Sequence, residues 1–440
     1  MNITHLQSST QIIQLGEIRI LTDPWLTDGE YYGSWYHYPP FPRSSIESLE
    51  YDFIYVSHIH PDHLSQDTFE ALPKKVPVLI HRYESQFLKF KLEKLFGFEV
   101  IECDHGKPFY FENSGSITIF AADNCNPELC GKFLGCAPVE TKFGSSQIDT
   151  LALFQYQDQS ILNTNDCPVE LAELTIKNNN LDKLGVDVLC VGYAGAGPYP
   201  QCFQFDDDNE KLQAAEEKKN QFLSKAIQYI KLVNPRAYIP FAGTYILGSR
   251  LSYLSNFRGV PSVKDAVNFL SANISNVSEG IYLEQFDLLN VKSLNKEKRF
   301  KENAKSYENY LSEISKKGLP HDSDNWNDAE LPAFIDNAYN RFKSKAEEIG
   351  LVSDTTLVIQ SENIRFSLQV DKQPRILSEI DVVNAPFVKI SVDHNLLHRL
   401  LRGPKFAHWN NAEIGSHLFY ERSPDRYERG LHHCLCFFHS

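Results

Sequence analysis

The sequence has no apolar run as long as a membrane-spanning helix, and its first residues have neither the basic start nor the apolar centre of a secretory signal. Positive charge is also scarce, because 43 Lys and Arg face 57 Asp and Glu and give a formal net charge of −14. Nucleic-acid backbones are bound through clustered Lys and Arg. We therefore expect no membrane and no nucleic-acid partner, and a small molecule as the substrate.

Cysteine spacing excludes two common frameworks. Nine cysteines are present, an odd number that argues against a disulfide framework. Cys125, Cys130 and Cys136 lie close together in the sequence but lack the Cys-x-x-Cys spacing of a structural zinc site. A Rieske iron–sulfur centre needs a Cys-x-His and a Cys-x-x-His loop that face each other. Such strings begin at Cys103 and Cys436, far apart in the chain and without a small domain around either. We expect no cluster, reduced thiols and a cytoplasmic location.

The 440 residues, 42% of them apolar, are enough for a full core and two folding units. Strand patterns dominate up to about residue 168, and helical patterns follow, including amphipathic helices predicted over 292–317 and 327–349. After Gly350 alternating strands return. The patterns predict an α/β fold with three parts, namely an α/β domain over 1–275, a helical extension or linker over 276–350 and a small α+β domain over 351–440.

Four potential metal ligands follow directly after the apolar stretch Tyr51–Val56, namely His58, His60, Asp62 and His63. The end of a strand points side chains into a shared pocket, and neutral imidazole together with carboxylate suits zinc or iron. A polar loop without a metal seldom has this spacing. The motif therefore predicts a metal centre. Asp62 is also the candidate general base, since a carboxylate near metal-bound water can accept its proton.

The arrangement His-x-His-x-Asp-His resembles the signature of the metallo-β-lactamase superfamily, whose fold is an αββα sandwich with the site along one sheet edge. The resemblance implies that His58 and His60 bind one metal ion and that Asp62 and His63 bind a second. It also implies that Asp166, after the strand over 160–163, bridges both ions. The alternative for Asp166 is a turn residue that caps the next helix.

Two departures from the superfamily pattern concern the remaining ligands. No His lies between His105 and His321, so Asp123, Cys125 and Glu128 are the candidates to complete the first metal position. The stretch Pro240–Gly243 stands where hydrolytic members usually end a strand with a His ligand. Each ion then has open positions for water, substrate or oxygen, and the sequence leaves zinc and iron open for the two divalent ions.

Three short stretches narrow the resemblance. Ile161–Cys167, Tyr193–Gly197 and Pro240–Gly243 are similar, in this order, to the metallo-β-lactamase-like part of the CMP-N-acetylneuraminate hydroxylase family. The leading hypothesis is a hydrolase of a small polar or anionic substrate that uses metal-activated water. The resemblance favours an iron-dependent oxygenase as the alternative, which would need a separate electron donor because no Rieske domain is expected. A metal-binding protein without turnover is the third hypothesis.

Two further segments are candidates to bind substrate. The aromatic loop with Trp35 and Tyr36 could roof a cleft or simply pack a connection. The glycine-rich turn with Tyr193 and Gly195 follows a strand and would let the backbone approach a ligand. The C-terminal part resembles sterol-carrier-type domains in its order of elements. Its histidines, including His394 and His398, are expected to be surface or core residues, because no carboxylate stands at ligand spacing.

Overall fold

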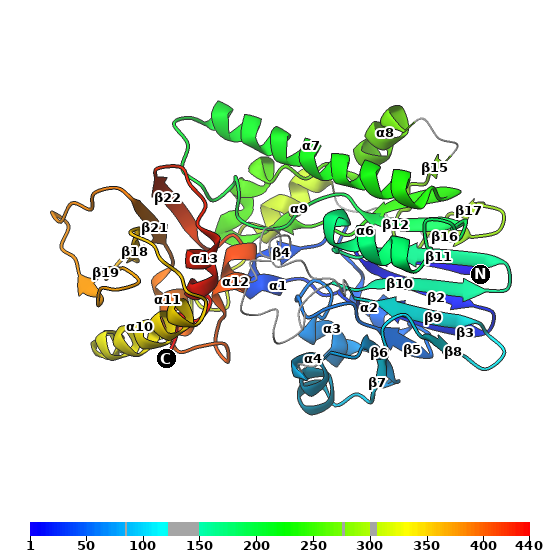
Figure 1. Cartoon of the computed structure of the whole chain (residues 1–440), viewed down its shortest axis with the longest axis horizontal. Helices are drawn as coiled ribbons and strands as arrows, with labels where there is room; N and C mark the ends of the chain where they lie inside the picture. The colour runs from blue at the N-terminus through cyan, green and yellow to red at the C-terminus, as the bar shows by residue number, and fades with distance from the viewer. Residues whose placement is uncertain (84–85, 122–148, 275–277, 300–305) are drawn as a thin grey trace.

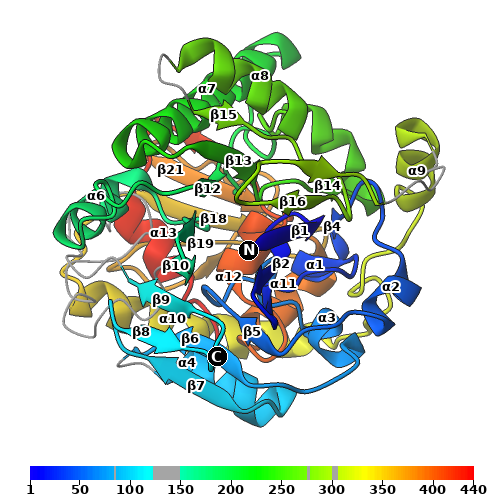
Figure 2. The same cartoon turned by 90° about the vertical axis from the view of Figure 1, so that its right-hand side faces the viewer.

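Two β-sheets lie face to face, helices cover their outer sides, and a smaller unit of helices and strands lies at one end (Figure 1). The computed structural model describes residues 1–83, 86–121, 149–274, 278–299 and 306–440. Figure 2 shows α6, α7 and α8 on the side of the sheets opposite to α3 and α4. Their bounds are Gln66–Ala71 for α3, Phe87–Phe90 for α4, Val169–Asn178 for α6, Asp208–Val233 for α7 and Val263–Asn273 for α8. The αββα sandwich expected from the sequence is confirmed.

The first sheet has eight strands in the order β17-β16-β1-β2-β3-β5-β6-β7. The bounds are Asn2–Gln7 (β1), Thr10–Leu15 (β2), Ile18–Thr22 (β3), Phe53–Tyr55 (β5), Val78–His81 (β6), Val100–Cys103 (β7), Leu288–Asn290 (β16) and Lys296–Glu297 (β17). Strands β3, β5, β6 and β7 run parallel. Because the carboxyl ends of parallel strands meet at one edge of a sheet, the loops after β3 and β5 lie side by side.

The second sheet has seven strands in the order β15-β13-β12-β11-β10-β9-β8. The bounds are Pro108–Tyr110 (β8), Ser116–Phe120 (β9), Leu151–Tyr156 (β10), Gln159–Asn163 (β11), Val188–Gly192 (β12), Ala237–Phe241 (β13) and Glu279–Gly280 (β15). Strands β10 and β11 form an antiparallel hairpin. The residues just before β10 and just after β11 therefore lie at the same edge of the sheet.

Apolar side chains from both sheets form one buried cluster between them. Ile13 and Ile20 of the first sheet and Ile119 and Phe154 of the second belong to it, and each is fully buried. Burying one such side chain contributes about 1.5–3 kcal/mol, so this layer is a large part of the folding free energy. The outer face of the second sheet packs on α6, α7 and α8 through a second cluster. Asp207 caps α7 by accepting hydrogen bonds from the backbone N–H groups of Asn209 and Glu210.

The C-terminal unit contains a five-stranded sheet in the order β20-β19-β18-β21-β22 and four helices. The strands span Thr356–Gln360 (β18), Arg365–Leu368 (β19), Arg375–Ile376 (β20), Phe387–Ser391 (β21) and Phe419–Ser423 (β22). The helices span Leu331–Glu348 (α10), His394–Leu401 (α11), Trp409–Ile414 (α12) and Arg429–Leu435 (α13). The limits of the three-part division made from the sequence remain a prediction.

The helix expected over 292–317 is much shorter in the structure. Helix α9 spans Tyr307–Ile314, whereas β17 pairs with β16 in a hairpin of the first sheet. The side chain of Asn290 accepts hydrogen bonds from the backbone and the side chain of Ser293, which closes the turn. Local turn chemistry therefore outweighs the helical charge pattern here. No helix in the described part of the chain is long and apolar enough to cross a membrane.

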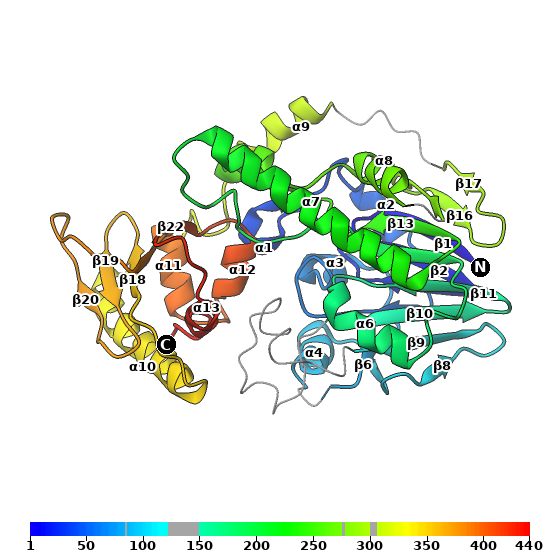
Figure 3. The same cartoon turned by 45° about the horizontal axis from the view of Figure 1, so that its top comes forward.

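The C-terminal unit, at the left in Figure 3, is joined to the sandwich by strand-like pairing and by a shared core. The backbone N–H of Tyr420 in β22 donates to the carbonyl of Cys202, 2.8 Å away, and Gln204 donates to the carbonyl of Tyr420, 2.9 Å away. The shared core contains Trp25 and Trp35 from the sandwich together with residues of α10 to α13. The short turn α1 (Glu30–Gly33) packs against α12.

Candidate metal centre

The loop between β5 and α3 carries four of the predicted ligands. It turns tightly after His60, because the backbone N–H groups of His63 and Leu64 both donate to the carbonyl of His60, at 3.0 and 2.8 Å. The side chains of His58, Asp62 and His63 are buried. The loop follows β5, whose last residues Ile54 and Tyr55 are fully buried. The imidazoles therefore start from a packed part of the fold.

The first donor group consists of His58, His60 and Asp149. Nε2 of His58 lies 2.8 Å from Nδ1 of His60 and 3.2 Å from Oδ1 of Asp149. Burial and the charges of neighbouring imidazoles lower the pKa of His58 well below its usual value. Burial also lowers the pKa of His60. Both rings are therefore neutral at pH 7, which is the form of imidazole that binds a metal ion.

The second donor group consists of His58, His63 and Asp166, so His58 belongs to both. Nε2 of His63 lies 3.4 Å from Oδ2 of Asp166 and 3.6 Å from Oδ2 of Asp62. Burial would lower the pKa of His63, but the surrounding carboxylates raise it well above its usual value. Asp166 has 36% of its side chain exposed and is the ligand candidate through which the centre meets solvent.

Asp23, at the end of β3, fixes the orientation of His63. Its Oδ2 atom lies 3.0 Å from Nδ1 of His63 and accepts the hydroxyl of Ser57 at 2.8 Å, and its Oδ1 atom accepts the backbone N–H of Ser57 at 2.7 Å. Asp23 is fully buried. Since Nδ1 of His63 is engaged by Asp23, Nε2 is the nitrogen that faces Asp62 and Asp166.

Tyr31 reaches the centre from the α1 turn. Its hydroxyl donates to Oδ1 of Asp62 at 2.5 Å, and its side chain is 3% exposed. Burial, and then the charge of Asp62, raises the pKa of Tyr31 well above its usual value, so the phenol stays protonated. Burial also raises the pKa of Asp62.

The donor set fits divalent metal ions. Burial, and then the charge of Asp166, raises the pKa of Asp149 well above the usual value of a carboxyl. Carboxylates that are buried near one another repel, and a cation between them removes this cost. Imidazole nitrogens and carboxylate oxygens are ligands that zinc, iron and manganese accept. The donor atoms within each group lie within 4.8 Å of one another, which is compatible with a shared ion.

The structure brings all five predicted ligands into one region and adds a sixth candidate. Asp149 lies one residue removed from the start of β10, and Asp166 follows β11 of the same hairpin. Sequence reasoning paired His58 and His60 with Asp166, whereas the structure places Asp149 beside them. The available signal was an Asp shortly before an apolar strand whose hairpin partner is followed by another Asp. The candidates Asp123, Cys125 and Glu128 lie outside the described residues.

The four predicted substrate-binding residues lie in tightly packed surroundings. Trp35 is 1% exposed and stacks on Tyr245 with ring centres 3.4 Å apart. Tyr36 and Tyr193 are also buried. A Cβ atom added to Gly195 would lie 2.0 Å from the ring of Phe222, so a larger residue here would have to displace that ring. Packing explains these positions, and a role in substrate binding remains a prediction.

The C-terminal unit contains a carboxylate that the sequence did not reveal beside His394 and His398. Oδ1 of Asp328 lies 2.8 Å from Nε2 of His394 and 2.9 Å from Nε2 of His398. Arg402 donates to Nδ1 of His398 at 2.8 Å, so the proton of His398 resides on Nε2 and is donated to Asp328. Asp328 is too distant in the sequence to have been recognised from spacing, and Arg402 supplies the positive charge that a metal ion would bring. The prediction that these histidines are surface or core residues remains a prediction.

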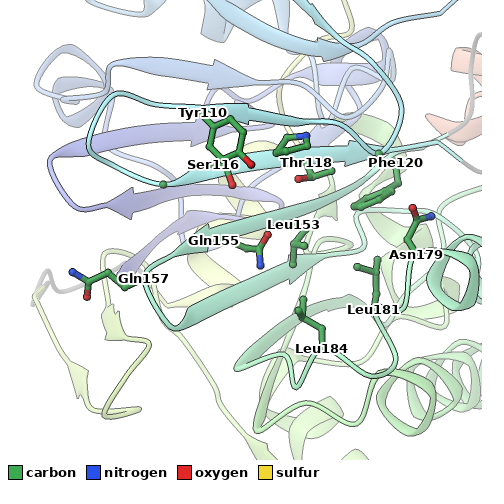
Figure 4. A pocket seen from close by; sticks show the side chains of 13 residues that line it. Tyr110, Ser116, Thr118, Phe120, Leu153, Gln155, Gln157, Asn179, Leu181 and Leu184 are labelled. Atoms are coloured by element: carbon green, nitrogen blue, oxygen red, sulfur yellow. The ribbon is translucent and has the colours of Figure 1, made fainter.

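A pocket of about 500 Å³ lies on the second sheet, away from these donor groups (Figure 4). Tyr110, Thr118 and Gln155 project from β8, β9 and β10, and Leu181 and Leu184 close the other side. It shares no residue with either donor group. Its lining contains no His, Cys, Asp or Glu, so it offers a surface for contact rather than groups for catalysis.

Comparisons with known proteins agree with the geometry of the fold. Residues 2–123 match the family model described as a beta-lactamase superfamily domain. The chain is 28% identical to the cytidine monophosphate-N-acetylneuraminic acid hydroxylase of Danio rerio over 254 residues, which cover 56% of this chain and 38% of that protein. The hydroxylase of Asterias rubens is 26% identical over 278 residues, which cover 61% of this chain and 38% of that protein. The chain thus spans well under half the length of these relatives.

Among solved structures, the isothiocyanate hydrolase from Delia radicum gut bacteria is similar, with a TM-score of 0.44 and 13% identity. The match covers 66% of this chain and 99% of that chain. The diiron β-hydroxylase CmlA from Streptomyces venezuelae matches with a TM-score of 0.39 and 13% identity, covering 64% of this chain and 53% of that chain.

Proposed function

We propose that the centre of this chain, whose residues 2–123 match the model of a beta-lactamase superfamily domain, hydrolyses a small polar or anionic molecule with the help of two divalent metal ions. The observation that carries this proposal is that His58 belongs to two donor groups, one with His60 and Asp149 and one with His63 and Asp166. Two neighbouring metal positions are the arrangement used to stabilise both the attacking and the leaving oxygen of a displacement.

The two groups define two metal positions that share His58. His58, His60 and Asp149 would hold one ion, and His58, His63 and Asp166, with Asp62 beside His63, would hold the other. Ions bound there would polarise a carbonyl or phosphoryl oxygen and lower the pKa of water toward about 7. The side chain of Asp166 is 36% exposed, against 10% for Asp62 and 5% for Asp149, so substrate and water would enter beside Asp166.

Asp62 is the proposed proton acceptor. Its Oδ1 atom accepts the hydrogen bond of Tyr31, and its Oδ2 atom lies 3.6 Å from Nε2 of His63. Burial raises the pKa of Asp62, and a carboxylate with a raised pKa is a stronger base than an ordinary surface carboxylate. Asp23 holds the ring of His63, and His63 in turn fixes the position of Asp62 relative to the proposed metal ion.

A second candidate function is iron-dependent hydroxylation, in which the same residues would bind iron. It is favoured by the curated relatives, which are named as hydroxylases of a nucleotide-linked sugar acid. Two His and one carboxylate with open positions is a set that iron oxygenases use. This function would require an electron donor, because reduction of the second oxygen atom of O₂ to water consumes electrons that the substrate does not supply.

One experiment separates these proposals. The full chain is stripped of metal and reloaded with Zn²⁺ or with Fe²⁺ in the absence of oxygen, and then offered ester, lactone, phosphodiester and amide substrates. The hydrolase proposal predicts turnover without oxygen or reductant, and loss of that turnover in Asp166→Asn. Turnover that requires Fe²⁺, oxygen and a reductant would overturn it in favour of the hydroxylase. Full metal loading without turnover under either condition would support a metal-binding protein instead.

A further inference from the structure

The turn that carries Tyr31 has an unusual backbone. Tyr31 (φ 51°, ψ 54°) and Tyr32 (φ 61°, ψ 41°) are both in the left-handed region. Residues with side chains rarely adopt this conformation, and two in succession are less common still, because each costs free energy that other contacts must offset. The turn therefore depends on contacts outside the segment Glu30–Gly33.

Those contacts come from the C-terminal unit. Nε2 of His417 donates a buried hydrogen bond to the carbonyl of Tyr31 at 2.8 Å, and the backbone N–H of His408 donates to the hydroxyl of Tyr32 at 2.7 Å. Gly415 faces Tyr31 so closely that an added Cβ atom would lie 2.8 Å from its carbonyl oxygen and 2.9 Å from its Cβ. The turn that contains Tyr31 and the segment that contains Gly415 and His417 therefore pack closely together, although almost four hundred residues separate them in the sequence.

The side chain of Tyr31 connects this packed turn to the metal centre. Its ring packs against Trp35 with ring centres 4.5 Å apart, and its hydroxyl donates to Oδ1 of Asp62 at 2.5 Å. The other oxygen of Asp62 faces His63 at 3.6 Å. Tyr31 is thus the link between the C-terminal unit and a carboxylate of the centre.

We propose that Tyr31 is a positioning residue for Asp62 and that the C-terminal unit, through His417 and Gly415, completes the metal centre by holding Tyr31 in place. The C-terminal unit is then part of the enzyme's working site rather than an appended domain. This inference rests on the proposed metal centre but not on the choice between hydrolysis and hydroxylation.

The first test uses Tyr31→Phe, which keeps the ring and removes only the hydroxyl that Asp62 accepts. Tyr310→Phe is the matched control, because Tyr310 also donates to a carboxylate, Oδ2 of Asp28 at 3.0 Å, outside both donor groups. Affinity for Zn²⁺ is measured on the full chain by competition with a chelator. We expect Tyr31→Phe to weaken the weaker of two binding steps about 10- to 100-fold and Tyr310→Phe to leave both steps unchanged.

The second test addresses the C-terminal unit. Gly415→Ala and His417→Ala should weaken the same binding step as Tyr31→Phe, and His417→Gln, which keeps an N–H donor, should restore part of the loss. If Tyr31→Phe and His417→Ala both bind Zn²⁺ as tightly as the unchanged chain, the proposal is wrong and Tyr31 is a core residue only. An unchanged chain that binds Zn²⁺ but turns over no substrate would contradict the proposed function while leaving this test intact. With an active chain, a lower kcat at an unchanged KM in Tyr31→Phe is the second expected readout.

Discussion

Oδ2 of Asp23 lies 3.0 Å from Nδ1 of His63 and thereby turns the opposite nitrogen of the ring toward Asp62 and Asp166. A carboxylate behind a metal-binding imidazole fixes the tautomer and makes the ring a stronger ligand. The loop after β3 therefore takes part in the centre although it supplies no ligand in either donor group.

Asp23→Asn tests this relationship. The amide cannot accept the hydrogen bonds of Ser57 and His63 as the carboxylate does, so we expect metal affinity to fall about 10- to 100-fold. Asp287→Asn is a suitable control, because Asp287 is also buried and accepts a backbone N–H, from Glu284 at 2.9 Å, but belongs to neither donor group. Equal Zn²⁺ affinities for the two variants would show that Asp23 has no such role.

The sharing of His58 gives a second prediction about metal content. His58→Ala removes a donor from both groups, so we expect both ions to be lost, whereas Asp149→Ala should remove only the ion held with His60. The metal-to-protein ratio after gel filtration measures this directly. If Asp166→Ala empties both positions and Asp149→Ala neither, Asp166 bridges the ions as the sequence suggested and Asp149 is no ligand.

Chelation gives a third prediction, on stability. A ligand that binds only the folded chain at 100 times its Kd stabilises it by about 2.7 kcal/mol. Chelator should therefore lower the Tm of the unchanged chain by a few degrees, and it should have no effect on His58→Ala. Because protons compete for His and Asp donors, the difference should shrink as the pH is lowered to about 5. A Tm that chelator leaves unchanged at pH 7.5 would argue against bound metal.

Lys218 in α7 gives a fourth prediction, on pH. Burial, with the charge of Arg258, lowers the pKa of Lys218 from 10.5 to about 7, while its amine donates to the carbonyl of Tyr199 at 2.8 Å. The unfolded chain therefore binds more protons than the folded chain between these two values. The cost of burying the charged amine is fully present below pH 7 and fades as the pH rises toward 10.

The free energy of unfolding should accordingly gain up to about 1.4 kcal/mol per pH unit from this group in that range. Lys218→Met should lose this slope and be more stable than the unchanged chain near pH 7. Urea denaturation at several pH values provides the measurement, with Lys219→Met, a neighbouring and more exposed lysine paired with Glu216, as the control. Parallel pH profiles of all three proteins would contradict the prediction.

The fold and most of the centre could be predicted because their signals are local. His58, His60, Asp62 and His63 lie in one loop directly after an apolar strand, so a short stretch of sequence contains the whole pattern. Asp166 was found for the same reason, since it closes an apolar strand. Asp149 could not be predicted in the same way, because it reaches His58 only through the pairing of β10 with β11 in the second sheet. That pairing is not visible in the residues around Asp149.

The placement of Tyr31 could not be predicted at all. Its left-handed backbone has no signal in Tyr-Tyr-Gly, and it is maintained by His417 and Gly415 at the other end of the chain. The aromatic loop was therefore open to two interpretations, a roof over the site or packing of a connection. The structure gives the loop both a packing role, through Trp35, and a direct contact with the centre, through Tyr31.

The donor groups draw His58, His60 and His63 from the first sheet and Asp149 and Asp166 from the second. An ion held by both sets would act as a removable cross-link between the two layers, placed at one edge of their shared core. Separation of the layers would then require release of the ion, so the unfolding rate should depend on the concentration of free metal. In a cell, the lifetime of this protein against proteolysis would follow the supply of its metal.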